Sequence, residues 1–222
     1  MPKRKSSATV VTSAKKSTRK EKSATKSHQK EGENDNSTIH RMEEDINEPV
    51  SSIEHYQDIW IIGSSLISWA FLAAIELGFT SDLNFDKHKI LWQGRRGMRW
   101  NGVFKLLKHL LTFIDPPKFL VLHCGANDLG RMKTIELIVA IKRDLKKIQM
   151  ILPHTKIIWS QMITRIAWKC EGRPDIEKSR ARVNSAIAKH ILYHHNGGYI
   201  KQSNIHHSPD NYRPDGVHLS TP

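Results

Sequence analysis

The sequence predicts an α/β protein, specifically a three-layer α/β/α sandwich with helices on both faces of a central, mostly parallel sheet. Two observations lead to this fold class. From residue 58 onward, short apolar runs alternate with longer segments of helical periodicity. Such alternation implies β–α–β crossovers, which bury both faces of a parallel sheet. No internal repeat interrupts the order.

Short runs of aliphatic and aromatic residues predict the strands, and longer amphipathic segments predict the helices between them. The strands are expected at residues 58–63, 89–92, 119–123, 156–161 and, as a short fifth strand, 198–200. The helices are expected at residues 66–78, 103–114, 134–152 and 175–195. The first helix runs into a glycine and the second stops before Pro116 and Pro117, which cannot continue it.

The first quarter of the chain differs in composition from the rest. Residues 1–50 contain no Trp, Phe, Tyr, Leu or Cys, whereas all six Trp lie between residues 60 and 168. A segment so poor in large apolar groups cannot offset its ordering entropy. We therefore expect a disordered tail over residues 1–57, followed by one folded domain over residues 58–222.

The formal charge of +13 is unevenly distributed along this chain. Residues 1–30 carry a balance of +9, residues 31–50 carry −6, and residues 51–222 carry +10. A basic run followed by an acidic run is typical of a solvated tail with interaction capacity. Such a tail could serve nuclear import or loose, non-specific nucleic-acid binding, and it could equally be a solubilising arm.

Several protein classes are disfavoured by simple features of the sequence. The charged N-terminus is not followed by an apolar segment of the kind found in secretory signals, and no apolar run is long enough to span a membrane. The two cysteines, Cys124 and Cys170, are too few for a disulfide framework. These features favour an intracellular protein, nuclear or cytoplasmic, with no membrane partner.

Chemically useful residues follow the predicted strands at four places. "IIGSSL" carries Ser65 where the first strand meets its helix, and "GRRGMRW" carries Gly97 after the second. "HCGAND" carries Asn127 after the third strand, and "RPDGVHLS" near the end of the chain carries Asp215 and His218 three residues apart. The dipole of a helix stabilises negative charge that develops on a serine at its N-terminus, which would assist a nucleophile. Ser64 or Ser65 could equally serve only to cap the helix.

Taken together, these four blocks resemble the GDSL/SGNH hydrolase superfamily, over about residues 58–220. The resemblance implies an SGNH- or flavodoxin-like fold and a serine esterase that acts on a small ester, without a metal or organic cofactor. Ser65 would be the nucleophile, His218 the general base and Asp215 the carboxylate that orients it. The backbone N–H groups of Ser65 and Gly97 and the side chain of Asn127 would form the oxyanion hole.

Two departures from the family pattern bear on activity. The family usually has Asp before its serine, where this chain has Ser64. In the family a further helix commonly follows the histidine, whereas this chain ends four residues after His218, which indicates a truncated domain. A catalytically weak or inactive binding module of the same fold, with a nucleic-acid-binding basic tail, is therefore the alternative function. A basic arm before such a module also resembles open reading frames of some vertebrate retrotransposons.

Two further features of the sequence have a structural explanation beside a functional one. His190 and His194 have the helical spacing of two zinc ligands, but "HILYH" lacks the catalytic glutamate of "HExxH". A solvated helix face explains them better. Four arginines near the site loops suggest either an anionic substrate or exposed solubilising charge: Arg95, Arg96, Arg99 and Arg131.

Overall fold

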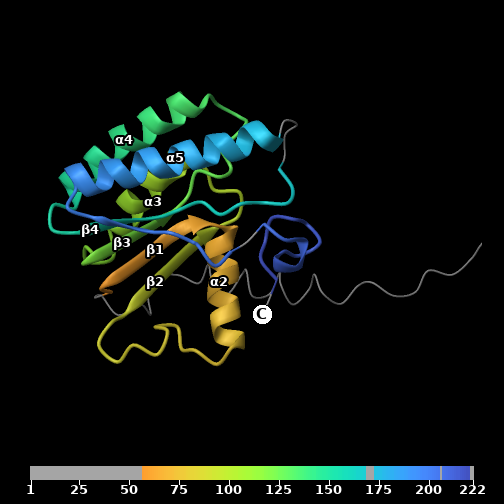
Figure 1. Cartoon of the computed structure of the whole chain (residues 1–222). Helices are drawn as coiled ribbons and strands as arrows, with labels where there is room; N and C mark the ends of the chain where they lie inside the picture. The colour runs from red at the N-terminus through yellow and green to blue at the C-terminus, as the bar shows by residue number, and fades with distance from the viewer. Residues whose placement is uncertain (1–56, 169–172, 206, 221–222) are drawn as a thin grey trace, which may run out of the picture. The chain divides into compact units, whose positions relative to one another are not determined.

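The computed structural model describes residues 57–168, 173–205 and 207–220. Residues 1–56 of the predicted tail, Cys170 and His206 lie outside the described residues. The described part of the chain confirms the predicted fold class: a central sheet of five parallel strands flanked by helices (Figure 1). The strand order is β2-β1-β3-β4-β5.

The strands follow the apolar runs closely. They are β1 (Ile59–Ser64), β2 (Ile90–Arg95), β3 (Phe119–His123), β4 (Lys156–Ser160) and β5 (Gly198–Ile200). The helices are α2 (Ser65–Glu76), α3 (Trp100–Leu110), α4 (Thr134–Ile151) and α5 (Arg173–His194). A short 3-10 turn, η2 (Pro209–Asn211), opens the terminal segment.

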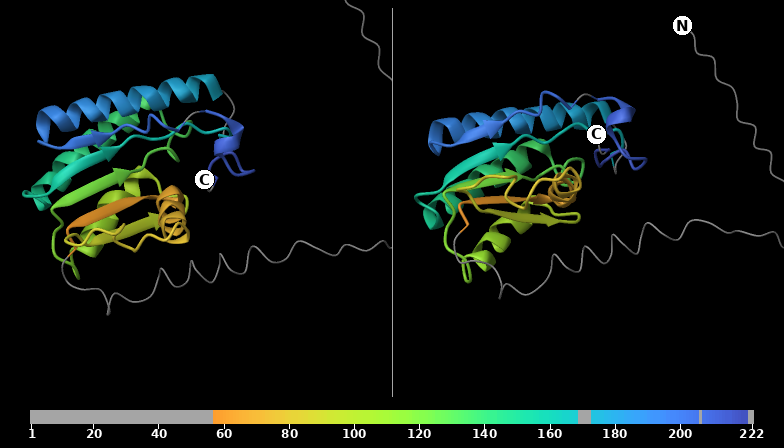
Figure 2. Two further views of the ribbon diagram at one scale, coloured as in Figure 1. Left: turned by 60° about the horizontal axis from the view of Figure 1, so that its bottom comes forward. Right: turned by 90° about the horizontal axis from the view of Figure 1, so that it is seen from below.

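The two faces of the sheet are covered unequally. Helices α3, α4 and α5 lie side by side on one face, while α2 packs on β1 and β2 on the other (Figures 1 and 2). Side chains that point toward the three-helix layer, such as Trp60, Leu120 and Trp159, are fully buried. Their neighbours on the opposite face, Ile61 and Val121, are only half-buried. The main core therefore lies between the sheet and α3–α5.

This strand order decides where a site can form. The helix after β1 and the helix after β3 leave these adjacent strands toward opposite faces of the sheet. In open parallel sheets, a crevice opens beyond the carboxyl ends of the strands at such a switch point. Ser65 follows β1 and Asn127 follows β3, so the fold brings both residues to this crevice.

Candidate functional site

Gly63 allows the β1–α2 junction to lie close to the neighbouring strand. Gly63 pairs with His123 of β3 in the sheet register. A Cβ at this position would lie 2.6 Å from Ile67 Cγ1 and closer still to the His123 carbonyl oxygen. The absence of a side chain thus lets β1 turn directly into α2, which starts at Ser65. Ser64 occupies the N-cap position, but its side chain makes no capping hydrogen bond.

The Ser65 hydroxyl lies within hydrogen-bonding distance of a histidine from the far end of the chain. Ser65 Oγ and His218 Nε2 are 2.8 Å apart, and His218 Nδ1 lies 2.5 Å from Asp215 Oδ2. An ionised carboxylate only accepts hydrogen bonds, so Nδ1–H donates to Asp215. In the neutral ring Nε2 is then the acceptor, and Ser65 donates to it. These contacts form with a serine, Ser64, at the position before Ser65.

Backbone groups of the same loop fix the Asp215 carboxylate. Its Oδ1 accepts hydrogen bonds from the backbone N–H groups of Val217 (2.9 Å) and His218 (3.0 Å). Partial burial acts to raise the pKa of Asp215, but these N–H groups and the imidazole outweigh it and lower the pKa below its usual range. Asp215 therefore stays ionised and can hold the imidazole in one tautomer and orientation.

The terminal segment that carries Asp215 and His218 is attached to the segment after β4. The Gly216 carbonyl accepts hydrogen bonds from the backbone N–H groups of Ile166 (2.8 Å) and Ala167 (2.9 Å). Gly216 has φ +64°, and a Cβ there would lie 2.9 Å from the Ala167 nitrogen. Both the turn and this close approach therefore require glycine at Gly216.

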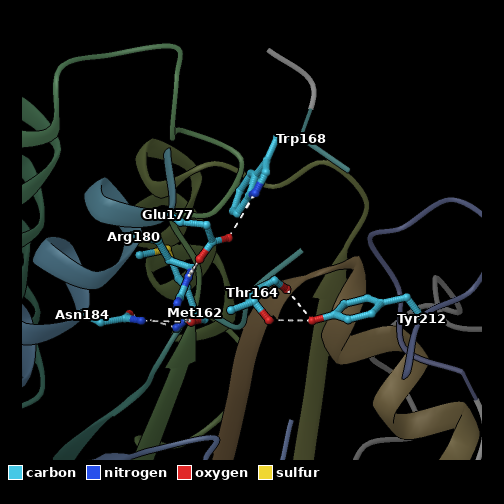
Figure 3. A network of polar contacts seen from close by, with 7 residues as sticks. All are labelled: Met162, Thr164, Trp168, Glu177, Arg180, Asn184 and Tyr212. Atoms are coloured by element: carbon cyan, nitrogen blue, oxygen red, sulfur yellow. Dashed lines mark hydrogen bonds and ion pairs between the residues drawn. The ribbon is translucent and has the colours of Figure 1, made fainter. Parts of the chain in front are cut away.

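A polar network supports the segment after β4 from both sides (Figure 3). Tyr212 OH donates to the Thr164 carbonyl (2.9 Å) and lies 2.7 Å from the Thr164 hydroxyl. On the α5 side, the buried Asn184 amide donates to the Met162 carbonyl and accepts from the Met162 N–H, both at 2.9 Å. Arg180 also donates to the Met162 carbonyl, at 2.8 Å. This network ties the segment after β4 to α5 on one side and to the terminal segment on the other, and the sequence contained no motif for it.

Trp69 and Arg213 enclose the other side of His218. The Trp69 ring lies 5.8 Å from the His218 ring, and the Arg213 guanidinium stacks 3.7 Å from the Trp69 ring centroid. Beyond them lies a cavity of about 330 Å³ whose wall is largely apolar and includes Leu66, Ala70 and Ala73 of α2.

The loops after β2 and β3 are joined by hydrogen bonds. Asn127 Nδ2 donates to the Met98 carbonyl at 3.0 Å, and Asp128 Oδ2 accepts from the backbone N–H of Trp100 at 2.9 Å. Asp128 thereby supplies a hydrogen-bond acceptor to the first turn of α3 from another loop. An amide nitrogen carries two hydrogens, so one remains for a ligand at Asn127. Gly97 lies in the adjoining turn with φ +68°, a conformation that favours glycine.

Arg165, which the sequence analysis did not identify, holds the other end of the Asn127 side chain. Its Nη1 donates to Asn127 Oδ1 at 3.3 Å, and its guanidinium lies 5.1 Å from the Trp168 ring. The side chain is only 4% exposed. Burial lowers the pKa of Arg165, partly opposed by Asp215, Tyr212 and Glu177. No short motif surrounds this residue, so only the fold reveals its position.

Asn127, Gly97 and Arg165 share the wall of a cavity of about 300 Å³. Its other lining residues are Arg99, Ala126, Leu129, Arg131 and Trp168. A larger cavity, about 530 Å³, lies between α5 and the segments after β4 and β5, and neither Ser65 nor His218 lines it. Neither residue lines the smaller cavity either, but that cavity is lined by Gly97 and Asn127, which the sequence resemblance assigns to the oxyanion hole.

The histidines of α5 and Cys124 were the other groups with potential for chemistry. His190, His194 and His195 cluster, and burial together with the neighbouring rings lowers the pKa of His190 to about 4. Within residues 57–168, 173–205 and 207–220, no three His, Cys, Asp or Glu side chains form a group that could hold a metal ion. Cys124 lies in the core, where burial raises its thiol pKa to about 12. None of the helices in the described ranges has the length and apolar character that a bilayer crossing requires.

Comparisons with known proteins bear on the fold. A scan against protein-family models gave no match, and a search of curated proteins gave none either. Among solved structures, a GDSL-like lipase from Bacteroides thetaiotaomicron is similar at 13% identity and TM-score 0.53, over 83% of this chain and 89% of that one. A member of the lipolytic G-D-S-L family from Veillonella parvula is similar at 16% identity and TM-score 0.54, over 75% and 91%.

A third similar structure is the psychrotrophic esterase EstA from a Pseudoalteromonas species, inhibited by monoethylphosphonate. Its identity is 17% and its TM-score 0.55, over 73% of this chain and 87% of that one. This similarity agrees with the fold that the sequence resemblance implied. This chain has the fold of the GDSL/SGNH hydrolases.

Proposed function

We propose that this protein is a serine hydrolase that cleaves small esters, with Ser65 as nucleophile, His218 as general base and Asp215 as the orienting carboxylate. The observation that carries the proposal is the continuous hydrogen-bonded chain from Ser65 Oγ through His218 to Asp215 at the switch point of the sheet. A serine that merely caps a helix needs neither partner.

In the proposed reaction, His218 Nε2 takes the Ser65 proton while Oγ attacks the ester carbonyl carbon. The negative charge that develops on the carbonyl oxygen is stabilised by the N–H groups of Ser65 and Gly97 and by the free amide hydrogen of Asn127. Each such donor is worth about 3–4 kcal/mol of transition-state stabilisation. His218 then protonates the departing alcohol, which leaves an acyl group on Ser65.

Water completes the cycle. His218 accepts a proton from a water molecule that attacks the acyl carbonyl, and the second tetrahedral intermediate collapses to release the acid. The same proton then returns from His218 to Ser65 Oγ. The ionised Asp215 stabilises the imidazolium that forms in each half of the cycle.

Hydrolysis of para-nitrophenyl acetate by the full chain tests this proposal. We expect Ser65→Ala and His218→Ala each to lower kcat/KM by at least about 10³-fold, since members of a catalytic triad act as a unit. Matched controls are Ser203→Ala and His109→Ala, which change exposed residues outside the site.

Turnover that survives both site substitutions would overturn the assignment. No turnover by a chain with a folded near-UV circular dichroism spectrum would instead favour the alternative, an inactive binding module of the same fold. In that case nucleic-acid binding by the tail, measured against ionic strength, would be the next property to test.

A further inference from the structure

The cavity beside Asn127 is unusually basic. Three guanidinium groups line it, from Arg99, Arg131 and Arg165, and no carboxylate residue does. In the described part of the chain, none of the three forms an ion pair with Asp or Glu within 4.0 Å. Arg95 and Arg96, which the sequence also suggested, do not line this cavity.

Arg165 is the member that demands a partner. Taking a guanidinium out of water is costly unless its donors are satisfied. Arg165 is 4% exposed, yet its Nε is buried without a hydrogen-bond partner. Its contacts with Asn127 and Trp168 involve a neutral oxygen and an aromatic face. A buried, positively charged donor on the wall of an open cavity is suited to an anion.

Nearby acidic groups do not neutralise the cavity. Asp128 feels the charges of Arg99 and Arg131, but its Oδ2 is engaged by the Trp100 N–H and the residue does not line the cavity. Glu177 acts on Arg165 at longer range, but it accepts hydrogen bonds from Arg180 and Trp168. Asp215 is engaged by His218. The cavity is therefore lined by three positively charged residues, and the acidic residues outside it offset their charge only in part.

From these observations we infer that the ester substrate carries an anionic group, a carboxylate or phosphate, which binds to Arg99, Arg131 and Arg165. This inference rests on the proposed esterase function. Asn127 lines the same cavity and is a proposed oxyanion donor, so an anion bound there would lie on the oxyanion side of the ester. The apolar cavity on the His218 side would receive an uncharged part of the substrate.

Matched ester pairs test this inference, because the members of each pair differ in charge and otherwise only by one methyl group. One pair places the charge on the acyl side: para-nitrophenyl hydrogen glutarate and its methyl ester. The second places it on the alcohol side: para-acetoxybenzoate and its methyl ester. The measured quantity is the ratio of kcat/KM for the anionic ester over the neutral one, with uncatalysed hydrolysis subtracted.

For the unmodified chain we expect a ratio of about 10 or more in one pair, and that pair identifies which side of the ester carries the charge. Arg99→Gln and Arg131→Gln should each lower this ratio by about 5–10-fold, and added salt should lower it too. Both residues are exposed, so their replacement does not disturb the core. Arg182→Gln, an exposed arginine on α5 outside the cavity, is the control and should leave the ratio as it was.

Two results would overturn the inference while leaving the esterase proposal intact. One is hydrolysis of the neutral esters with a ratio near one in both pairs. The other is a ratio that Arg182→Gln lowers as much as Arg99→Gln does. That result would show that the preference for anionic esters comes from the net positive charge of the protein and not from the cavity. Hydrolysis of neither member of either pair would instead refute the proposed function, and the inference with it.

Discussion

Gly63→Ala tests whether close packing at the β1–α2 junction sets the position of Ser65. Replacing glycine by alanine where the backbone tolerates it stabilises a protein by about 0.4–1 kcal/mol through the unfolded state. Here the added methyl group would meet Ile67 Cγ1 at 2.6 Å and approach the His123 carbonyl even more closely. That carbonyl belongs to β3, which pairs with β1, so it cannot move freely.

Overpacking of this kind costs about 1–3 kcal/mol. The two effects together predict a net loss of about 1–2 kcal/mol in the free energy of unfolding, measured by urea denaturation. We also expect a loss of ester turnover, because relief of the clash would displace the start of α2 and with it Ser65.

Gly102→Ala is the matched control for this prediction. Gly102 lies in α3, and a Cβ there would be 3.7 Å from Met98 Cε, an ordinary contact. Alanine in a helix should stabilise the protein by about 0.5–1 kcal/mol. If Gly63→Ala unfolded at the same urea concentration as Gly102→Ala and kept full turnover, the packing argument would be refuted.

Three further predictions concern the site and its support. Asn127→Ala should lower kcat for ester hydrolysis by about 10²–10³-fold with the fold retained, and an unchanged kcat would exclude its amide from the oxyanion hole. Asn184→Leu should cost at least about 2 kcal/mol in the free energy of unfolding measured with urea, because the Met162 N–H and the Trp159 indole N–H lose their acceptor; a smaller cost would show that these two groups find other acceptors. Burial, aided by the charge of Arg165, lowers the pKa of His123 from 6.5 to about 4. The neutral ring thus contributes stability above about pH 6.5 that is lost as the pH falls to about 4, so His123→Gln should show a smaller drop in Tm over this range than the unmodified chain; an equal drop would contradict this.

The sequence predicted the architecture well because each strand is a short apolar run between helical or turn segments. The runs at β3 and β5 matched to the residue, and β4 differed only at Gln161. The start of α3 was less accurate: the helix begins at Trp100, before the predicted residue 103. The reason is non-local, because the Trp100 N–H is satisfied by Asp128 from another loop. Periodicity within a segment cannot reveal a hydrogen bond supplied from elsewhere in the chain.

Some residues of the candidate site could be predicted from the sequence, and others are revealed only by the fold. Ser65, Asp215 and His218 stand in recognisable blocks, and the structure places them in mutual hydrogen-bonding contact. Arg165 and Asn184 have no such block, and each acts through a contact with a residue distant in the sequence. Their roles depend on how the segment after β4 lies beside its neighbours, which short motifs do not encode.

The most direct test of the central claim is to treat the full chain with a fluorophosphonate and map the adduct by peptide mass spectrometry. Such probes react with activated serines, and capping serines do not react. The account predicts an adduct on the peptide that contains Ser65, retained in Ser203→Ala and absent from both Ser65→Ala and His218→Ala. An unlabelled chain with a folded circular dichroism spectrum, or an adduct at another residue, would contradict the account.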